Sequence, residues 1–334
     1  MEGNIRLVHG DGGKYTALLL KEIFYKHLEN DLLVNSLDAC LFKVKEGNLA
    51  FTTDTFVVKP LIFPGGDIGK LAVCGTINDL VVSGAMPLYL SCGFIIEEGF
   101  STVMLETIAK SMGEVLRETG VKIITGDTKV VEKGAVDGLF INTSGIGVIK
   151  KDFEKKEVNA GDKLIISGGI GEHGTTIAVE RYKLNVKGNL KSDCMPMKRI
   201  MEQLTKYAPY IKIMKDPTRG GLATALNEIS EYFKMGIHLI EEKIPIKKEV
   251  LSVNQLLGLD PLYMASEGRM IIAVDKNICE DLLTDIRKYE GFEDSAIIGN
   301  FFDSGSKSIV FVETLIGGKR IVRALEGDML PRIC

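Results

Sequence analysis

Four aspartates stand in apolar surroundings in the first half of the chain. They are Asp38 in "SLDAC", Asp54 in "TTDTF", Asp79 in "TINDL" and Asp127 in "TGDTKV". Magnesium takes oxygen ligands and is usually held by one or two carboxylates together with substrate phosphates. Carboxylates that gather at strand ends would suit such a site. Taken singly, each aspartate is also explained as a helix cap, a turn residue or half of a salt bridge. An aspartate in an apolar helix, such as Asp79, would require a partner for its charge.

Lys129 follows Asp127 by two residues on the same expected strand. Side chains two apart on a strand point to the same face, so this ammonium group could offset charge on a phosphate. A solvated edge lysine is the alternative interpretation.

Three glycine-containing turns offer backbone amides that could bind an anion. They are "HGDGG" (9–13), "FPGGDIGK" (63–70) and "DPTRGGLA" (216–223). The last is the most specific, because it places Pro217 near a helix start and Arg219 beside a Gly pair that permits close backbone approach. A Gly-Gly turn that merely opens a helix remains open as an explanation, and "GGDIGK" lacks the spacing of a P-loop.

Two further residues could act as a general base. His173 in "GEHGTT" and Glu267 in "MASEGRM" lie in what read as short polar turns between apolar strands. Each is also explained as a capping or turn residue.

The six cysteines are widely spaced, with no CxxC pair, which argues against a zinc site or a disulfide framework. Cys74 and Cys92 are expected to be buried core thiols. Cys334 is the last residue, in "LPRIC", where a core position is not expected. A thiol there is either incidental or a nucleophile.

Alternating strand and helix patterns predict two α/β domains. In the first, helices are expected over 67–84, with Asp67 as N-cap and an apolar stripe through Val73, Ile77 and Val81, and over 101–120. The charged stretch from Lys150 to Asp162 is the expected connection to a second α/β block. Neither block has the order or the glycine motif of a Rossmann sheet.

Composition narrows the functional class. The net charge is −4 and no run of Lys and Arg reaches five, so nucleic acid and membrane surfaces are not expected partners. No signal-peptide pattern and no window of ~18 apolar residues is present, so a cytoplasmic protein is expected. A chain of 334 residues favours two domains of roughly 150 residues each.

Read in order, the motifs resemble the hydrogenase-maturation HypE family, within the superfamily of aminoimidazole ribonucleotide synthetase and selenophosphate synthetase. The matching segments span essentially the whole chain, and the terminal "PRIC" is the most specific. They are "HGDGG", "TDTFVVKPLIFPGGDIGKLAVCGTINDL", "SGAMPLYLSCGFIIEEG", "TGDTKVVEKGAVDGLFINTSG", "DPTRGGLA", "ASEGRM" and "PRIC". Asp11 in "HGDGG" departs from the family pattern, which usually has a small residue there.

The resemblance implies an α/β (α+β) chain with a two-domain PurM-like fold. Its N-terminal domain would pair into a dimeric β-barrel, and its C-terminal domain would be an α/β sandwich. The implied parts are an N-terminal segment with a glycine-rich lip (1–36), an ATP-binding and dimerisation domain (37–150), a C-terminal domain (162–326) and a flexible tail (327–334).

The resemblance also implies an activity, that of an ATP-dependent carbamoyl dehydratase. The carbamoyltransferase HypF would load a carbamoyl group onto Cys334. The chain would then dehydrate it to a thiocyanate, consuming ATP with Mg²⁺, and the cyanide would pass to iron on a HypC–HypD complex for [NiFe] hydrogenase.

Roles for individual residues follow from the same resemblance. Asp54, Asp79 and Asp127 would hold Mg²⁺, with Asp38 and Asp216 as weaker candidates, and Lys129 would offset charge on the transferred phosphate. Glu267 would be the base, with His173 second. The ATP-binding set would comprise Asp38, Asp54, Asp79, Asp127, Thr128, Lys129 and Asp216.

Two other interpretations remain. The chain could be another ATP-dependent synthetase of the superfamily, although selenophosphate enzymes place a reactive Cys or selenocysteine followed by Lys near the N-terminus, and this chain has none there. It could instead be a nonenzymatic carrier that displays Cys334 while a partner performs the chemistry.

Overall fold

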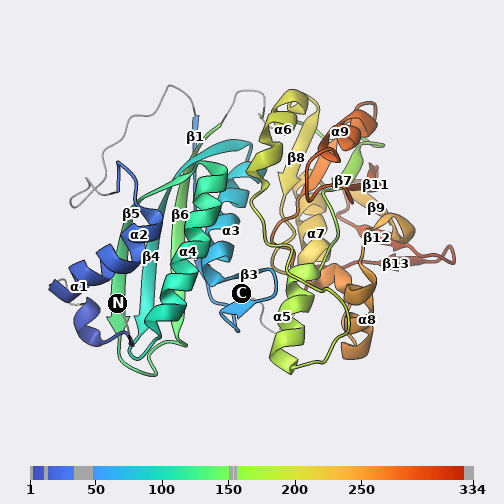
Figure 1. Ribbon diagram of the computed structural model, residues 1–334. Helices are drawn as coiled ribbons and strands as arrows, with labels where there is room; N and C mark the ends of the chain where they lie inside the picture. The colour runs from blue at the N-terminus through green and yellow to red at the C-terminus, as the bar shows by residue number, and fades with distance from the viewer. Residues whose placement is uncertain (1–2, 11–13, 34–47, 150–152, 154–155, 327–334) are drawn as a thin grey trace.

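The protein is described from a computed structural model, which covers residues 3–10, 14–33, 48–149, 153 and 156–326 (Figure 1). Asp11, Asp38 and Cys334 lie outside these residues. No helix of the described part is long and apolar enough to cross a membrane.

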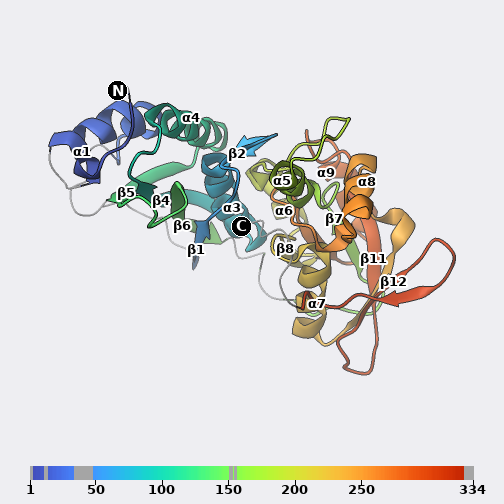
Figure 2. The same cartoon turned by 90° about the horizontal axis from the view of Figure 1, so that it is seen from below.

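A four-stranded sheet in the order β1-β6-β4-β5 organises the first domain. Neighbours in this sheet are antiparallel, except that β4 and β5 run parallel. Helices cover one face of the sheet, and in the described residues the opposite face has no helix on it (Figure 2). The elements are β1 (Asn48–Phe56), α3 (Ile68–Val82), β4 (Ala85–Glu97), α4 (Thr102–Thr119), β5 (Lys122–Val131) and β6 (Leu139–Ile149), with short pieces at Leu7–Gly10, α1 (Lys14–Leu19), Leu20–Tyr25, α2 (Lys26–Leu28), β2 (Ile62–Phe63) and β3 (Gly66–Asp67).

A seven-stranded mixed sheet in the order β13-β12-β9-β11-β7-β10-β8 organises the second domain. Side chains of α6 and α9 belong to the apolar cluster on the side that meets the first domain, whereas α7 packs in the cluster on the other side. The elements are β7 (Lys163–Ile166), α5 (Glu172–Tyr182), α6 (Met201–Tyr207), β8 (Ile211–Lys215), α7 (Gly221–Phe233), β9 (Gly236–Ile240), α8 (Lys248–Leu257), β10 (Ile271–Val274), α9 (Cys279–Ile286), β11 (Ala296–Phe302), β12 (Val310–Glu313) and β13 (Lys319–Ile321).

The expected helix boundaries in the first domain are confirmed. Asp67 caps α3 by accepting hydrogen bonds from the backbone N–H groups of Gly69 and Lys70, at 2.7 and 3.0 Å. Ser101 is the N-cap of α4, and Gly120 ends that helix in the left-handed conformation at φ 67°. Local capping chemistry therefore sets both helices.

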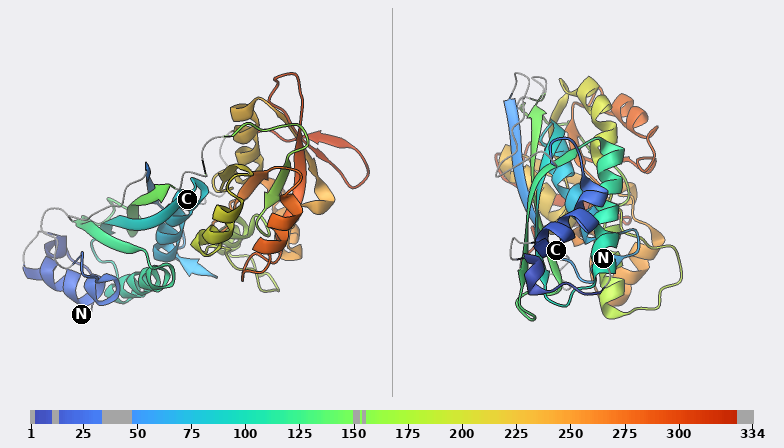
Figure 3. Two further views of the ribbon diagram at one scale, coloured as in Figure 1. Left: turned by 90° about the horizontal axis from the view of Figure 1, so that it is seen from above. Right: turned by 60° about the vertical axis from the view of Figure 1, so that its left-hand side comes forward.

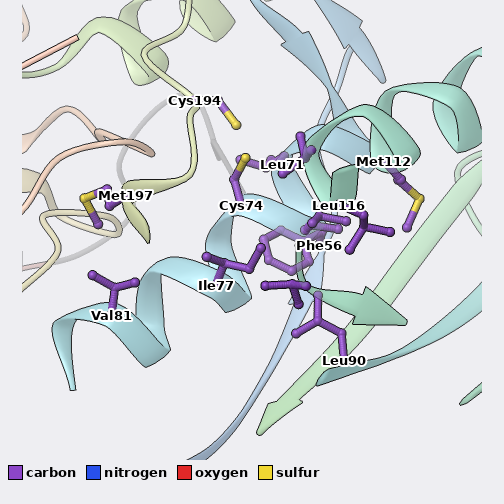
Figure 4. Close-up of a cluster of buried hydrophobic side chains, with 14 of the residues drawn as sticks. Phe56, Leu71, Cys74, Ile77, Val81, Leu90, Met112, Leu116, Cys194 and Met197 are labelled. Atoms are coloured by element: carbon purple, nitrogen blue, oxygen red, sulfur yellow. The ribbon is translucent and has the colours of Figure 1, made fainter. Parts of the chain in front are cut away.

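The expected apolar stripe on α3 is buried, as predicted, and the burial extends beyond the stripe to nearly every side of the helix. Side chains from the sheet, from α4 and from the second domain converge on it (Figure 4): Phe56, Leu90, Met112, Leu116, Cys194 and Met197. One apolar core thus runs through the domain boundary. The ribbon views show the two domains side by side (Figure 3).

The "DPTRGG" turn opens α7 as expected. Gly220 and Gly221 both have left-handed backbone angles, φ 74° and 59°. A Cβ at Gly221 would lie 2.6 Å from the carbonyl oxygen of Leu262, so only glycine fits.

Gly221→Ala should therefore lower the free energy of unfolding by about 3 kcal/mol, the sum of a backbone and an overpacking cost. Gly258 is the matched control, because its φ is 69° and no atom lies within 4 Å of its would-be Cβ. Gly258→Ala should cost only about 1 kcal/mol. Urea unfolding of the two variants measures the difference, and equal losses would contradict the steric argument.

Candidate functional site

A cavity of about 170 Å³ lies between the two domains and is rich in carboxylates. The first domain supplies its wall from β1 and α3, and the second from the segment after β8 and the loop before β10. The lining residues are Thr53, Asp54, Thr55, Phe56, Gly75, Asp79, Asp216, Thr218, Arg219 and Glu267.

Strand register and helix geometry aim the first-domain carboxylates. Asp54 pairs across the sheet with Thr143, whose hydroxyl donates to the carbonyl of Ala72 in α3, so this face of β1 looks toward α3. Asp79 lies in the last turn of α3, and the hydroxyl of Thr52 donates to its Oδ2 at 2.9 Å. Thr52 and Asp54 are two apart on β1 and therefore share a face.

The second domain brings Asp216 and Glu267 to the opposite wall. Asp216 follows β8 directly, and its turn is tied to the Glu267 loop by a hydrogen bond from Ser266 N to Pro217 O at 3.0 Å. Glu267 is 5% exposed. Two loops that lie far apart in the sequence, at residues 216 and 267, thus form one surface.

Burial raises the pKa values of these carboxylates, and for most of them a neighbouring carboxylate adds to the rise. Burial, with the nearby charges of Asp216 and Asp54, raises the pKa of Asp79 to about 7. Burial also raises the pKa of Asp54 and of Asp216, and it raises that of Glu267 well above its ordinary value, with Cys194 and Asp216 adding to the effect. Such a cluster favours the binding of either protons or a cation.

Asp127 and Lys129 do not join this cluster within one chain. Across the sheet, Asp54 pairs with Thr143, Thr143 with Cys92, and Cys92 with Gly126, the neighbour of Asp127. Strands β1 and β5 are therefore three strand spacings, or roughly 14 Å, apart. Asp127 also faces the helix-free side of the sheet. Its neighbour Thr128 pairs with Phe94, whose ring packs on Phe24 on the helix side, and adjacent residues of a strand point to opposite faces. The expected grouping of Asp54, Asp79 and Asp127 is therefore not formed by a single chain.

Lys129 lies beside Asp127 on the helix-free face, at 3.5 Å, and both side chains are largely exposed. Thr128 is 8% exposed and lines a small cavity beneath the N-terminal helices instead. Asp127 and Lys129 of the "GDTK" motif therefore lie on one face of the sheet, and Thr128 lies on the other.

His173 does not lie in a turn as expected but in the first turn of α5, fully buried. Its Nδ1 is 2.8 Å from Ser192 Oγ and its ring packs on Phe63. Burial lowers its pKa to about 3, and it does not line the carboxylate cavity. His173 therefore lies apart from the carboxylates of the cavity, and its role as a base stays a prediction.

Sequence analysis missed Asp193, which is buried and accepts hydrogen bonds from the backbone N–H groups of His173 and Glu267, at 3.1 and 3.2 Å. Burial raises its pKa to about 6, and the nearby Arg269 opposes that rise. Its surroundings, "KSDCMP", have no motif spacing, so no sequence signal marked it.

The donor chemistry of the cavity suits magnesium, which needs only one or two protein carboxylates when phosphates complete its coordination. Among the described residues, no three His, Cys, Asp or Glu side chains are close enough to hold a metal on their own. A metal here would therefore depend on oxygen ligands from a bound substrate.

Comparisons with known proteins agree with this architecture. The model of the AIR synthase related protein N-terminal domain matches residues 36–149, and that of the C-terminal domain matches residues 159–312. A protein of Bradyrhizobium diazoefficiens, carbamoyl dehydratase HypE, is 44% identical over 335 residues, covering 99% of this chain and 96% of the relative. The chain belongs to the carbamoyl dehydratase HypE family.

Solved structures of the HypE family show the same two-domain PurM-like fold. The crystal structure of a hydrogenase maturation protein HypE in complex with ATP has a TM-score of 0.94 at 42% identity, covering 98% of this chain and 99% of that one. The crystal structure of a HypE–HypF complex has a TM-score of 0.80 at 44% identity, covering 92% and 99%.

The pKa of Asp79 predicts a pH-dependent stability. Its folded value, about 7, is above its ordinary 3.8, so the folded state binds more protons and wild type gains stability as pH falls through 7 toward 4. Asp79→Asn removes the buried charge and should be more stable than wild type at pH 8, by about 2 kcal/mol after discounting for partial exposure.

Urea unfolding at several pH values measures this difference, which should shrink toward zero near pH 4. Asp281→Asn is the control, because Asp281 is exposed on α9, outside the cavity and outside the first sheet. A stability gain for Asp79→Asn that is constant across this pH range would contradict the explanation.

Proposed function

We propose that this protein uses ATP to dehydrate an S-carbamoyl group on its own Cys334 to S-cyanate, a thiocyanate, as a source of cyanide ligands for the iron of [NiFe] hydrogenase. The observation that carries the proposal is the cavity of four carboxylates between the domains, in a chain 44% identical to a carbamoyl dehydratase. ATP, HypF and HypC–HypD are the proposed substrate and partners, and the cytoplasm is the proposed location because the reaction consumes ATP.

The chemistry explains the need for ATP. Dehydrating a thiocarbamate expels its carbonyl oxygen, and hydroxide is a poor leaving group because the pKa of water is about 15.7. Phosphate, with a second pKa of about 6, is less basic by about 10 units. That change is worth on the order of 13 kcal/mol, of which only a fraction lowers the barrier.

The atoms balance in two stages. The carbamoyl oxygen first takes the γ-phosphoryl group of ATP, releasing ADP and one proton from nitrogen. The C–O bond then breaks, phosphate leaves with that oxygen, and loss of the second N–H proton completes the C≡N bond. The elements of one water leave the thiocarbamate and end in phosphate and protons.

The proposed Mg²⁺ would be held by one or two of the carboxylates of Asp54, Asp79 and Asp216, with the ATP phosphates completing its coordination; the ion would screen the phosphate charge. Their raised pKa values support this, since a divalent cation would stabilise the charged carboxylates that burial disfavours, and would relieve the repulsion that adds to the rise at Asp79 and Asp216. Glu267, on the facing wall, is the proposed base for the N–H proton, because burial and its neighbours raise its pKa well above the ordinary range.

A homodimer is proposed to complete the site. The helix-free face of the first sheet exposes large apolar side chains: Leu49, Phe51 and Ile95 are 51%, 70% and 42% exposed. A sheet with an exposed apolar face is a typical packing surface. A second copy on this face would cover them and let Asp127 and Lys129 reach phosphates held at the partner's cavity.

Cys334 is the proposed carrier thiol. The eight residues of the tail from Gly327 can extend about 27 Å, which allows one thiol to serve both a loading enzyme and the ATP site. A relative of this chain forms a complex with HypF, which supports loading by that partner.

Intact-mass analysis with HypF, carbamoyl phosphate and ATP tests the reaction. Wild type should gain a carbamoyl group and then lose the mass of one water only when ATP is present, and Cys334→Ala should gain nothing. Addition at Cys334 without water loss would make the chain a carrier, and no addition would favour a small-metabolite synthetase.

Glu267→Gln should accept the carbamoyl group yet slow the water loss by about 10²-fold or more, because the proton acceptor is gone. The control is Glu280→Gln, an exposed acid on α9, which should react as wild type does. Full-rate water loss in Glu267→Gln would remove this residue from the mechanism.

Light scattering after gel filtration tests the dimer. Phe51→Glu should give a monomer with at least about tenfold less ATP turnover, because a charge cannot be buried against a second sheet. Leu256→Glu on α8, a site 72% exposed, should stay dimeric. A fully active monomeric wild type would contradict the proposal.

A further inference from the structure

Asn78 immediately precedes Asp79 on α3 and is 2% exposed. Its side chain makes three hydrogen bonds, and all of them go to main-chain groups of the second domain. Nδ2 donates to Met195 O at 3.0 Å and to Glu267 O at 3.1 Å, and Oδ1 accepts from Met197 N at 2.7 Å. The amide therefore bridges α3 to two separate loops across the domain boundary.

This arrangement uses both N–H donors and the oxygen of the amide group. A buried amide without such partners would carry a substantial desolvation cost, so its bonds to residues 195, 197 and 267 are mutually dependent. One turn earlier on the same helix, Cys74 points toward Cys194 of the same second-domain segment (Figure 4). This side of α3 therefore packs against residues 194–197.

The main chain around Glu267 is held on both sides. Its N–H donates to Asp193 Oδ1 at 3.2 Å, while its C=O accepts from Asn78. The next residue is Gly268, where a Cβ would lie 2.1 Å from the carbonyl oxygen of Asp193. The loop is therefore wedged between α3 and the segment 193–197, which orients the Glu267 carboxyl toward the cavity that it lines.

We propose that Asn78 is a positioning residue that holds Glu267 in register with Asp79. Consecutive residues of α3 then perform complementary tasks: Asp79 presents a carboxylate to one wall of the cavity, and Asn78 fixes the main chain of the residue on the other. The inference rests on the proposed function, in which Glu267 takes a proton while Asp79 helps to hold the phosphates. Small displacements of such groups reduce rates strongly.

A double-mutant cycle with Glu267→Gln tests this role. The rate is that of ATP-dependent water loss from the carbamoylated protein, measured by intact mass in a single turnover. Asn78→Ala should lower this rate by about 10-fold or more with the KM for ATP within about 2-fold. In the Glu267→Gln background the same change should cost less than about 3-fold, because the group it positions is already absent.

The pH profile gives a second readout. In Asn78→Ala, water reaches the Glu267 loop, so the raised pKa of that carboxyl should fall and the acidic limb of the rate profile should move to lower pH. A merely structural asparagine would leave this limb in place.

Asn227→Ala is the matched control. Asn227 lies in α7, and its Nδ2 donates to two main-chain carbonyls of the second domain, those of Ala223 and Val322. It should lower the melting temperature as Asn78→Ala does, without changing the rate or the pH profile. Asn78→Asp keeps the shape but loses the two donations, so it should be at least as slow as Asn78→Ala.

The outcomes separate this inference from the proposed function. If wild type loses no water, the proposed function fails. If wild type reacts but the losses from Asn78→Ala and Glu267→Gln simply multiply, or if folded Asn78→Ala and Asn78→Asp react at the wild-type rate, then Asn78 does not act through Glu267 and the inference is overturned.

Discussion

The burial of α3 on nearly all sides is the constraint on which the rest of the structure depends. One side of the helix packs on the first sheet, where Thr76 meets Thr143, and another meets the second domain through Asn78. A helix enclosed in this way places any carboxylate on it in a low-dielectric setting. Asp79 is that carboxylate, and its raised pKa follows from the enclosure.

Because α3 is enclosed by both domains, residues from both domains form one site. Asp54 and Asp79 belong to the first domain, whereas Asp216 and Glu267 belong to the second, and none of them would have the same environment in a separated domain. Because the apolar core is continuous across the boundary, the relative position of the two walls is fixed by packing rather than by the connecting segment. This gives the carboxylates a defined spacing, which charge repulsion alone would oppose.

The two faces of the first sheet have different tasks. The face toward the helices supplies the cavity through Asp54, and the other exposes apolar side chains together with Asp127 and Lys129. Alternation along each strand makes this division unavoidable, since neighbouring residues must point in opposite directions. A motif such as "GDTK" therefore serves two surfaces at once.

The sequence by itself determined the local features: the caps at Asp67 and Ser101, the glycine pair that opens α7, and the motifs that resemble the family. These depend on contacts between near neighbours, so residue type and spacing suffice to predict them. Only the tertiary structure decided that His173 is enclosed, that Asp127 faces away from Asp54, and that Asn78 and Asp193 hold the Glu267 loop. Those outcomes depend on strand order and on how the domains pack, which are set by contacts between residues far apart in the chain and leave no periodic mark in the sequence.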